Sequence, residues 1–263
     1  MNNQEKNPFQ VTYLGGPTII LEIGRFKLMT DPTLDPKGTS FVLNEKMTET
    51  KLTGPAVEEI PPVDVVLLSH DHHFDNLDSC GREYLKTVGQ TITTVAGAER
   101  LKGNSIGLSP GEYLVYDTPE GQQIKITATP ARHGPSGSEK ITGDVIGFHL
   151  AVEGKHPFEL YITGDTVFYN RIEELSKCID PSYVFIFAGA ARPRGPFNVT
   201  MGTNDALDTA YVFPRARIIP LHSEGWSHYT ESNSDLVDAF QILGIGKQLM
   251  LLEPGMTTSL PVE

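Results

Sequence analysis

Val65-Val66-Leu67-Leu68 leads straight into Ser69-His70-Asp71-His72-His73-Phe74-Asp75-Asn76. The second stretch packs three imidazoles and two carboxylates into six residues, which is costly unless a cation shares them. A buried strand that ends in such a cluster supplies neutral nitrogen and anionic oxygen ligands at one point in space. The stretch therefore predicts a metal site at the end of a strand, and a hydrolytic site is favoured.

Further candidate ligands follow other apolar runs along the chain. His133, Asp165 and His222 each lie just past such a run. A single histidine at a strand end is more often a hydrogen-bonded structural residue. The joint pattern reverses those odds, because strands are rigid and the loops at their ends converge on one rim. We therefore expect these three residues to share the metal site.

The composition bounds the class of protein. The chain has 263 residues, 39% of them hydrophobic, and a formal net charge of -12. No linker or low-complexity tract interrupts it, so we expect a single domain over residues 1–263. The negative charge argues against a nucleic-acid or anionic-membrane partner, because both need a positive surface. A small-molecule substrate is the expected partner.

Targeting and redox signals point to the cytoplasm. No apolar run is long enough to span a bilayer, and residues 1–6 lack the apolar core of a signal peptide. The chain has two cysteines, Cys80 and Cys178, which indicate no disulfide framework. We expect each cysteine to be a small buried residue.

Hydrophobic periodicity predicts a β-rich half, a strand–helix crossing, a second β-rich half and further crossings. Strands are expected over residues 11–14, 18–23, 25–29, 63–68, 91–95, 112–116, 123–128, 145–152, 158–163, 183–187 and 217–221. Helices are expected over residues 75–88, 98–102, 172–176, 203–212 and 231–243, with a polar, irregular loop over 39–60. This order fits an α/β fold in which two sheets are sandwiched between helices.

The motifs, taken in order, resemble the metallo-β-lactamase superfamily. They are Ser-His-x-His…Asp from residue 69, Pro-Ala-Arg-His at 130–133, Thr-Gly-Asp-Thr at 163–166 and Pro-Leu-His at 220–222. The L-ascorbate-6-phosphate lactonase-like branch is the most similar, and the likeness runs from about Val11 to Tyr229. The resemblance implies a four-layer αββα sandwich and a metal-dependent hydrolase.

The resemblance also implies a ligand set. It places His70, His73 and His133 at a first metal position, Asp75 and His222 at a second, and Asp165 between the two. No cysteine belongs to the motifs, and nitrogen and oxygen ligands favour Zn²⁺, with Mn²⁺ or iron as alternatives. We expect one tight site and a weaker second one.

Two departures from the superfamily pattern His-x-His-x-Asp-His leave alternatives open. Starting at His70 leaves one extra residue before the carboxylate, whereas starting at Asp71 keeps the spacing but replaces the first histidine. We favour His70 and His73 with a one-residue insertion, and His72 is the alternative to His73. Asn76 stands where the second position expects an imidazole. A neutral amide is a poorer ligand, which predicts the weaker second site.

The expected chemistry is hydrolysis by a metal-activated hydroxide, because a metal-bound water loses its proton near neutral pH. Asp75 or Asp165 would take up that proton, so these two carboxylates are the candidate catalytic residues. The substrate class is a lactone, ester or phosphoester of a small metabolite, with an anionic group as one option. Two rival functions are kept. One is a degenerate member that binds metal and a ligand without catalysis, and the other, ranked last, is a redox di-iron protein.

Several other residues are candidates for substrate contacts. An arginine among Arg132, Arg192 and Arg194 would suit a phosphate or carboxylate group, although a solvated role is the more common one for any single arginine. The loop 134–138 is expected to act as a lid. His228 is a candidate partner of a metal ligand or of the substrate.

Overall fold

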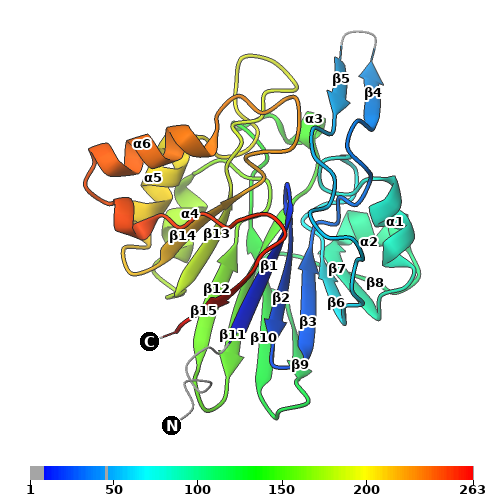
Figure 1. The fold of residues 1–263 in the computed structure, drawn as a ribbon, viewed down its shortest axis with the longest axis vertical. Coiled ribbons are helices and arrows are strands. Elements are labelled where there is room, and N and C mark those ends of the chain that lie inside the picture. The colour runs from blue at the N-terminus through cyan, green and yellow to red at the C-terminus, as the bar shows by residue number, and fades with distance from the viewer. Residues whose placement is uncertain (1–8, 45–46, 263) are drawn as a thin grey trace.

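The computed structural model describes residues 9–44 and 47–262, which form two sheets packed face to face (Figure 1). The first sheet contains, in spatial order, β15 (Thr257–Leu260), β1 (Phe9–Gly15), β2 (Thr18–Ile23), β3 (Phe26–Thr30), β6 (Val65–Leu67), β7 (Gln90–Thr94) and β8 (Ser105–Leu108). The second contains β14 (Arg217–Leu221), β13 (Tyr183–Phe187), β12 (Phe158–Ile162), β11 (Ile146–Glu153), β10 (Gln123–Pro130) and β9 (Tyr113–Asp117). A separate hairpin consists of β4 (Ser40–Asn44) and β5 (Met47–Thr50).

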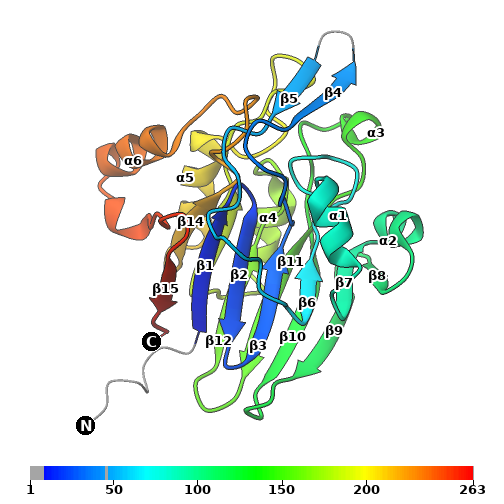
Figure 2. The same cartoon turned by 45° about the vertical axis from the view of Figure 1, so that its right-hand side comes forward.

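Helices cover the outer face of each sheet (Figure 2). Beside the first sheet lie α1 (Ser79–Leu85) and α2 (Val95–Leu101), and beside the second lie α4 (Asn170–Leu175), α5 (Thr203–Val212) and α6 (Asn233–Ile242). The short helices α3 (Glu139–Thr142) and η2 (Gly246–Gln248) lie in connecting segments. The predicted four-layer αββα sandwich is therefore confirmed.

Three apolar clusters hold the layers together. The largest lies between the sheets and takes side chains from both, such as Leu21 and Phe148. A second joins the outer face of the second sheet to α5 and α6, and a third joins the first sheet to α1. A strand with helices on one side and a sheet on the other is buried on both faces, so it is apolar at every position. The Tyr183–Phe187 strand shows this, since all its residues are buried.

Within each sheet, antiparallel strands are followed by parallel ones. The pairs β1–β2 and β2–β3 are antiparallel, whereas β3–β6, β6–β7 and β7–β8 are parallel. The second sheet repeats this order, with antiparallel β9 to β12 and parallel β12 to β14. The predicted order of β-rich halves and crossings is thus observed.

Some expected elements differ from the structure. The segment 39–60, expected to be an irregular loop, contains the β4–β5 hairpin. The helix expected from 75 begins only at Ser79, because Asp78 accepts a hydrogen bond from the Gly81 amide as its N-cap. Cys80 and Cys178 were expected to be buried and are exposed. In α1 the inward residues are Gly81 and Leu85, which leaves Cys80 on the solvent side.

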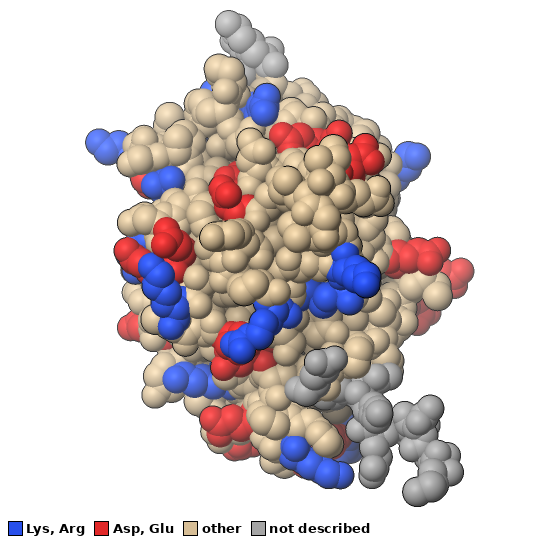
Figure 3. Space-filling model, turned by 90° about the vertical axis from the view of Figure 1, so that its left-hand side faces the viewer, with Lys and Arg blue, Asp and Glu red and all other residues tan. Residues whose placement is uncertain are grey.

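The surface and the helices add two observations. On the face that carries α6, Lys and Arg side chains alternate with Asp and Glu over a largely uncharged surface (Figure 3). None of the helices in the described ranges is long and apolar enough to cross a bilayer. That residues 1–263 form a single domain stays a prediction.

Candidate metal centre

The predicted ligands come together at one end of the two sheets, the upper end in Figure 1. His70 follows β6 of the first sheet, and Asp165 and His222 follow β12 and β14 of the second. Parallel strands place their carboxyl ends at the same edge of a sheet. Two sheets packed face to face thus bring the loops after these strands to a common point.

Four of these residues form a first cluster. The ligand atoms of His70, His73, His133 and Asp165 all lie within 4.8 Å of one another. His73 Nδ1 is 2.9 Å from His70 Nε2 and 3.1 Å from His133 Nε2. Asp165 Oδ2 is 3.8 Å and 3.6 Å from the same two Nε2 atoms. Bonds of about 2.0–2.1 Å would set neighbouring ligands of a tetrahedral zinc ion about 3.4 Å apart, which is the middle of this range.

Hydrogen bonds behind the cluster aim the imidazoles inward. His133 Nδ1 donates to the Val199 carbonyl oxygen at 2.7 Å, so its Nε2 carries a lone pair that faces the cluster. His70 Nδ1 lies 2.9 Å from the Ser69 hydroxyl. The Ser69 amide in turn donates to Asp31 Oδ1 at 2.7 Å, which fixes the chain where it leaves β6.

A second cluster consists of Asp75, Asp165 and His222, again within 4.8 Å of one another. His222 Nε2 is 3.3 Å from an oxygen of each carboxylate. Its Nδ1 is hydrogen-bonded to the Tyr229 hydroxyl, and its backbone amide donates to Gly16 O at 2.8 Å. The backbone of His222 has a φ of 55°, a strained conformation that is typical of functional sites. Asp165 belongs to both clusters.

The protonation states of the first cluster suit metal binding, whereas His222 is an exception, because burial lowers its pKa but Asp165 and Asp75 outweigh burial and raise that pKa to about 10. Burial is the main cause that lowers the pKa of His70 and His133, and it lowers that of His73 to about 3, so all three imidazoles are neutral at pH 7. Burial alone would raise the pKa of Asp75 and Asp165, but the neighbouring histidines outweigh it and keep both carboxyls ionised. Neutral imidazoles and ionised carboxylates are the forms that bind a metal ion.

One buried atom supports the same conclusion. Asp165 Oδ2 is buried and has no hydrogen-bond partner among the described residues, yet it faces two imidazole nitrogens. A buried carboxylate oxygen without a partner carries a large desolvation cost. The residues present therefore fit a divalent cation, which would accept the lone pairs of all four side chains.

The motif loop has the spacing expected for a one-residue insertion. His73 faces the cluster, whereas His72 is turned away, with its Nε2 2.7 Å from the Thr142 carbonyl oxygen of α3. Asp71, the first residue of the other spacing, is bound by Arg100, whose Nε donates at 2.9 Å. The geometry thus favours His70 and His73 as ligands, and their binding of metal stays a prediction.

Asn76 lies against the clusters, and that it is a poor ligand stays a prediction. Its Nδ2 donates to Asp165 Oδ1 at 3.3 Å and points to the Ser69 hydroxyl at 3.5 Å. The amide thus holds the carboxylate that the two clusters share. Because position 76 has no imidazole, the metal affinity of the second site depends on other residues, and its expected weakness stays a prediction.

The sequence analysis missed Glu49, which lies on β5 and is 4% exposed. Glu49, Asp75 and His228 form a third group whose ligand atoms lie within 4.8 Å of one another. Burial raises the pKa of Glu49 to about 7, with a further contribution from Asp75. Glu49 lies in the polar run Thr48-Glu49-Thr50-Lys51, which shows no hydrophobic alternation and was expected to be part of a loop.

A small cavity of about 70 Å³ opens onto these groups. Its lining includes His73, Asp75 and Asp165, and Leu43, Phe74 and Arg194 belong to it as well. Hydrophobic and basic side chains therefore stand beside the ligands. This cavity is much smaller than the roughly 300–1,000 Å³ of ordinary ligand pockets.

The three candidate arginines differ in position. Arg194 lines the cavity. Arg132 does not, because its guanidinium lies over the Tyr169 ring and its Nε donates to Gly134 O at 3.1 Å. Arg192 is exposed and donates to Asn198. At the end of the loop 134–138 the Ser138 hydroxyl lies 3.1 Å from His133 O and 2.7 Å from Pro135 O, and a role of this loop as a lid stays a prediction.

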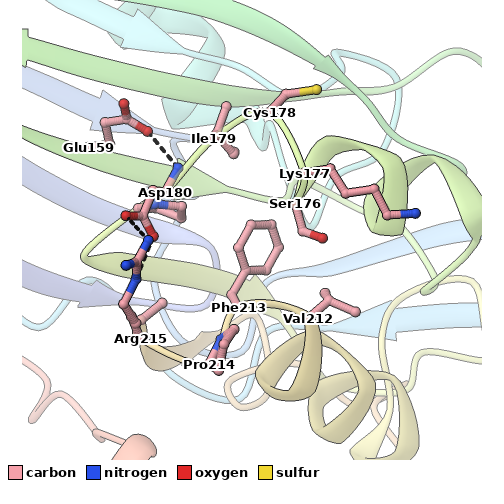
Figure 4. Close-up of a pocket in the computed structure, with 12 residues that line it drawn as sticks. Glu159, Ser176, Lys177, Cys178, Ile179, Asp180, Val212, Phe213, Pro214 and Arg215 are labelled. Carbon is pink, nitrogen blue, oxygen red and sulfur yellow. Dashed lines mark hydrogen bonds and ion pairs between the residues drawn. The ribbon is translucent and has the colours of Figure 1, made fainter.

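A larger cavity, of about 530 Å³, lies elsewhere and carries none of the predicted ligands. It is lined by residues after α4 and α5, among them Cys178, Lys177 and Phe213 (Figure 4). The exposed ion pair between Arg215 and Asp180 stands at its edge. Its charged side chains are already paired, Arg215 with Asp180, Lys177 with Glu173 and Glu159 with His149.

Comparisons with known proteins point to one family. The family described as "Beta-lactamase superfamily domain" matches residues 27–223. The UPF0173 protein YddR of Bacillus subtilis is 29% identical over 258 residues, which is 93% of this chain and 97% of that protein. A UPF0173 metal-dependent hydrolase of Pelotomaculum thermopropionicum is 24% identical over 95% of this chain and 100% of its own length. The isothiocyanate hydrolase from Delia radicum gut bacteria has a similar fold, with a TM-score of 0.78 at 22% identity over 96% of this chain and 99% of that one.

Proposed function

Because this chain belongs to the beta-lactamase superfamily, we propose that it is a metal-dependent hydrolase of a small-molecule substrate. The family match confirms the resemblance drawn from the motifs, while the lactonase-like branch stays a prediction. The observation that carries the proposal is the convergence of His70, His73, His133 and Asp165 within 4.8 Å. Relatives of nearly the same length that are named metal-dependent hydrolases support it.

Different residues of the chain have different roles in the proposed hydrolysis. A divalent ion bound there supplies Lewis acidity and brings the pKa of water toward neutrality. Asp75 and Asp165 are buried and ionised, and we assign to them the uptake of the proton from the attacking water. Tyr229 holds the His222 ring through a hydrogen bond to Nδ1, which keeps Nε2 directed at both carboxylates.

The finer features of the proposal rest on ligand type and on the cavity. Three imidazoles and a carboxylate favour Zn²⁺ at the first cluster, with Mn²⁺ or iron as alternatives. Arg194 stands in the cavity lining and would bind a phosphate or carboxylate of the substrate. We therefore favour an anionic lactone, ester or phosphoester. A cytoplasmic location stays a prediction.

A metal analysis and a substrate screen test the proposal. The purified chain is loaded with Zn²⁺ or Mn²⁺ and assayed on generic lactones, esters and phosphodiesters, beside His133→Ala and the matched surface variant His156→Ala. We expect His133→Ala to lose hydrolysis while its circular dichroism stays unchanged, because it removes one ligand from a four-ligand cluster. His156 is exposed, so its variant keeps the wild-type rate. Wild-type turnover in His133→Ala, or no turnover by the metal-loaded wild type on any class, would contradict the proposal.

A further inference from the structure

The predicted second metal position lacks one imidazole in the chain segment that should supply it. Position 76 is an asparagine, whose Nδ2 donates to Asp165 and points to Ser69 and whose neutral Oδ1 is a poorer ligand than an imidazole. What remains there is Asp75, His222 and the shared Asp165. A site of this kind needs a further ligand to equal the first cluster, which has three imidazoles.

We propose that His228 and Glu49 complete the second metal position together with Asp75, so that His228 replaces the imidazole absent at residue 76. This inference rests on the proposed function, because it assumes that the chain binds metal. The three side chains have their ligand atoms within 4.8 Å of one another, and Asp75 joins them to the group formed with His222 and Asp165.

The contacts of Asp75 mirror those of Asp165. Asp75 Oδ2 lies 2.9 Å from His228 Nε2 and 3.3 Å from His222 Nε2. In the first cluster, likewise, two imidazole nitrogens approach the single oxygen Oδ2 of Asp165. Two imidazoles that converge on one carboxylate oxygen are thus found on both sides of the site. The distances differ, since His228 is hydrogen-bonded to Asp75 whereas the nitrogens near Asp165 Oδ2 lie 3.6 and 3.8 Å away, but both sides gather imidazole nitrogens and a carboxylate oxygen as a metal ion would use them.

Burial and charge point the same way. The side chains of His228 and Glu49 are only 9% and 6% exposed, and His228 Nδ1 is buried with no hydrogen-bond partner among the described residues. Glu49, Asp75 and Asp165 place three carboxylates in a small volume beside two imidazoles. Carboxyl groups buried this close together are costly, and a divalent cation bound among them would lower that cost.

One pair of hydrogen bonds positions both Glu49 and His228. Thr50 and Ser227 bind each other twice, because the Ser227 amide donates to Thr50 O at 3.0 Å and the Thr50 amide donates to the Ser227 hydroxyl at 2.9 Å. Glu49 and His228 are the next residues along these two segments. The pairing between segments far apart in the sequence therefore sets Glu49 beside His228.

The ring of Phe41 fixes the same hairpin to the motif loop. Phe41 pairs with Glu49 across β4 and β5, and it stacks on Phe74 with ring centroids 4.2 Å apart. Phe74 precedes Asp75. All three residues of the proposed set are thus tied to neighbours that pack on one another, as a preorganised metal site requires.

Counting bound ions tests the inference without reference to activity. Zn²⁺ alone is titrated into four metal-free proteins: the wild type, His228→Gln, Glu49→Gln and the surface control His156→Ala. Affinities come from calorimetry and stoichiometry from elemental analysis. We expect two ions in the wild type and in the control. In either glutamine variant we expect the second ion to be lost or its affinity to fall by more than about 100-fold. Removing a residue that only hydrogen-bonds to a metal ligand lowers metal affinity by at most about 100-fold.

His228→Gln separates coordination from positioning. Glutamine retains a donor for the Asp75 carboxylate but is a poor metal ligand, so a residue that only positions Asp75 would leave the second ion in place. A second ion weakened less than about 100-fold in both variants, or a wild type that takes one ion only, overturns this inference and leaves the proposed function standing. A wild type that binds no ion sinks the proposed function itself.

Discussion

The buried ion pair between Lys51 and Asp78 offers a sharp test of how the hairpin is fixed to the motif loop. Lys51 Nζ lies 2.9 Å from Asp78 Oδ2 and 2.5 Å from Thr33 O, and the two side chains are 4% and 0% exposed. Asp78 also accepts from the amides of Gly81 and Asp35 at 2.8 and 2.7 Å. Removing one partner from such a pair leaves a buried charge without compensation, which costs about 3–5 kcal/mol.

We expect Lys51→Met and Asp78→Asn each to lower the free energy of unfolding by about 3–5 kcal/mol. The double variant leaves no uncompensated charge, so it should cost less than the sum of the two, with a coupling energy of about 2–3 kcal/mol. The Oδ1 of asparagine keeps the N-cap of α1, but its Nδ2 cannot accept from the Asp35 amide, so Asp78→Asn removes the charge and one hydrogen bond and leaves the cap.

Urea unfolding of the four proteins measures this coupling. The fluorescence of Trp226, the one tryptophan of the chain, reports locally, because its backbone bridges to Lys51. The exposed pair Lys86–Glu83 serves as a control, with side chains 69% and 72% exposed. There, Lys86→Met and Glu83→Gln should couple by less than about 0.5 kcal/mol. A coupling of that small size for Lys51 and Asp78 would refute the reasoning.

Two further predictions concern α1 and the motif loop. Alanine usually stabilises a helix relative to glycine, but a Cβ at Gly81 would collide with Pro32 O, so Gly81→Ala should lower the free energy of unfolding by about 1–3 kcal/mol. The control Gly246→Ala should not, because a Cβ there meets nothing nearer than 3.5 Å. Burial raises the pKa of Asp71, but hydrogen bonds from Arg100 outweigh it and leave that pKa below its usual value. This pair therefore stabilises the fold above about pH 4 and less as the pH falls through the folded-state pKa of Asp71. The melting temperature of Arg100→Ala should lie below that of the wild type at pH 7, the gap should narrow at pH 3, and an equal gap at both pH values would count against this.

Elements with strong local signals were predicted well from the sequence. The strands 183–187 and 217–221 and the helix 203–212 were placed as the structure has them. In each of these segments the pattern of hydrophobic residues matches the pattern of buried side chains. The β4–β5 hairpin gave no such signal, because stacking of Phe41 on Phe74 and pairing with residues 225–227 hold it in place. Contacts of that kind are decided by distant residues.

The candidate site was likewise predicted only in part from the sequence. The candidate ligands at strand ends could be named, because the strands that carry them are visible in the sequence. The orientation of each side chain could not. Arg132 adjoins His133, yet its guanidinium lies over Tyr169 and not in the cavity. Glu49 was missed altogether, since its neighbour His228 lies far along the chain.

The irregular motif shows how the fold tolerates an insertion among metal ligands. An extra residue in 70–75 turns two polar side chains out of the cluster, and each needs a partner if it is not to destabilise the loop. Arg100 binds Asp71, and the Thr142 carbonyl oxygen accepts from His72. With both outward residues bound, His73 is free to meet His70 and His133. The insertion is therefore compatible with a complete first cluster, and the exchange at Asn76 concerns only the second position, where His228 lies within reach of Asp75.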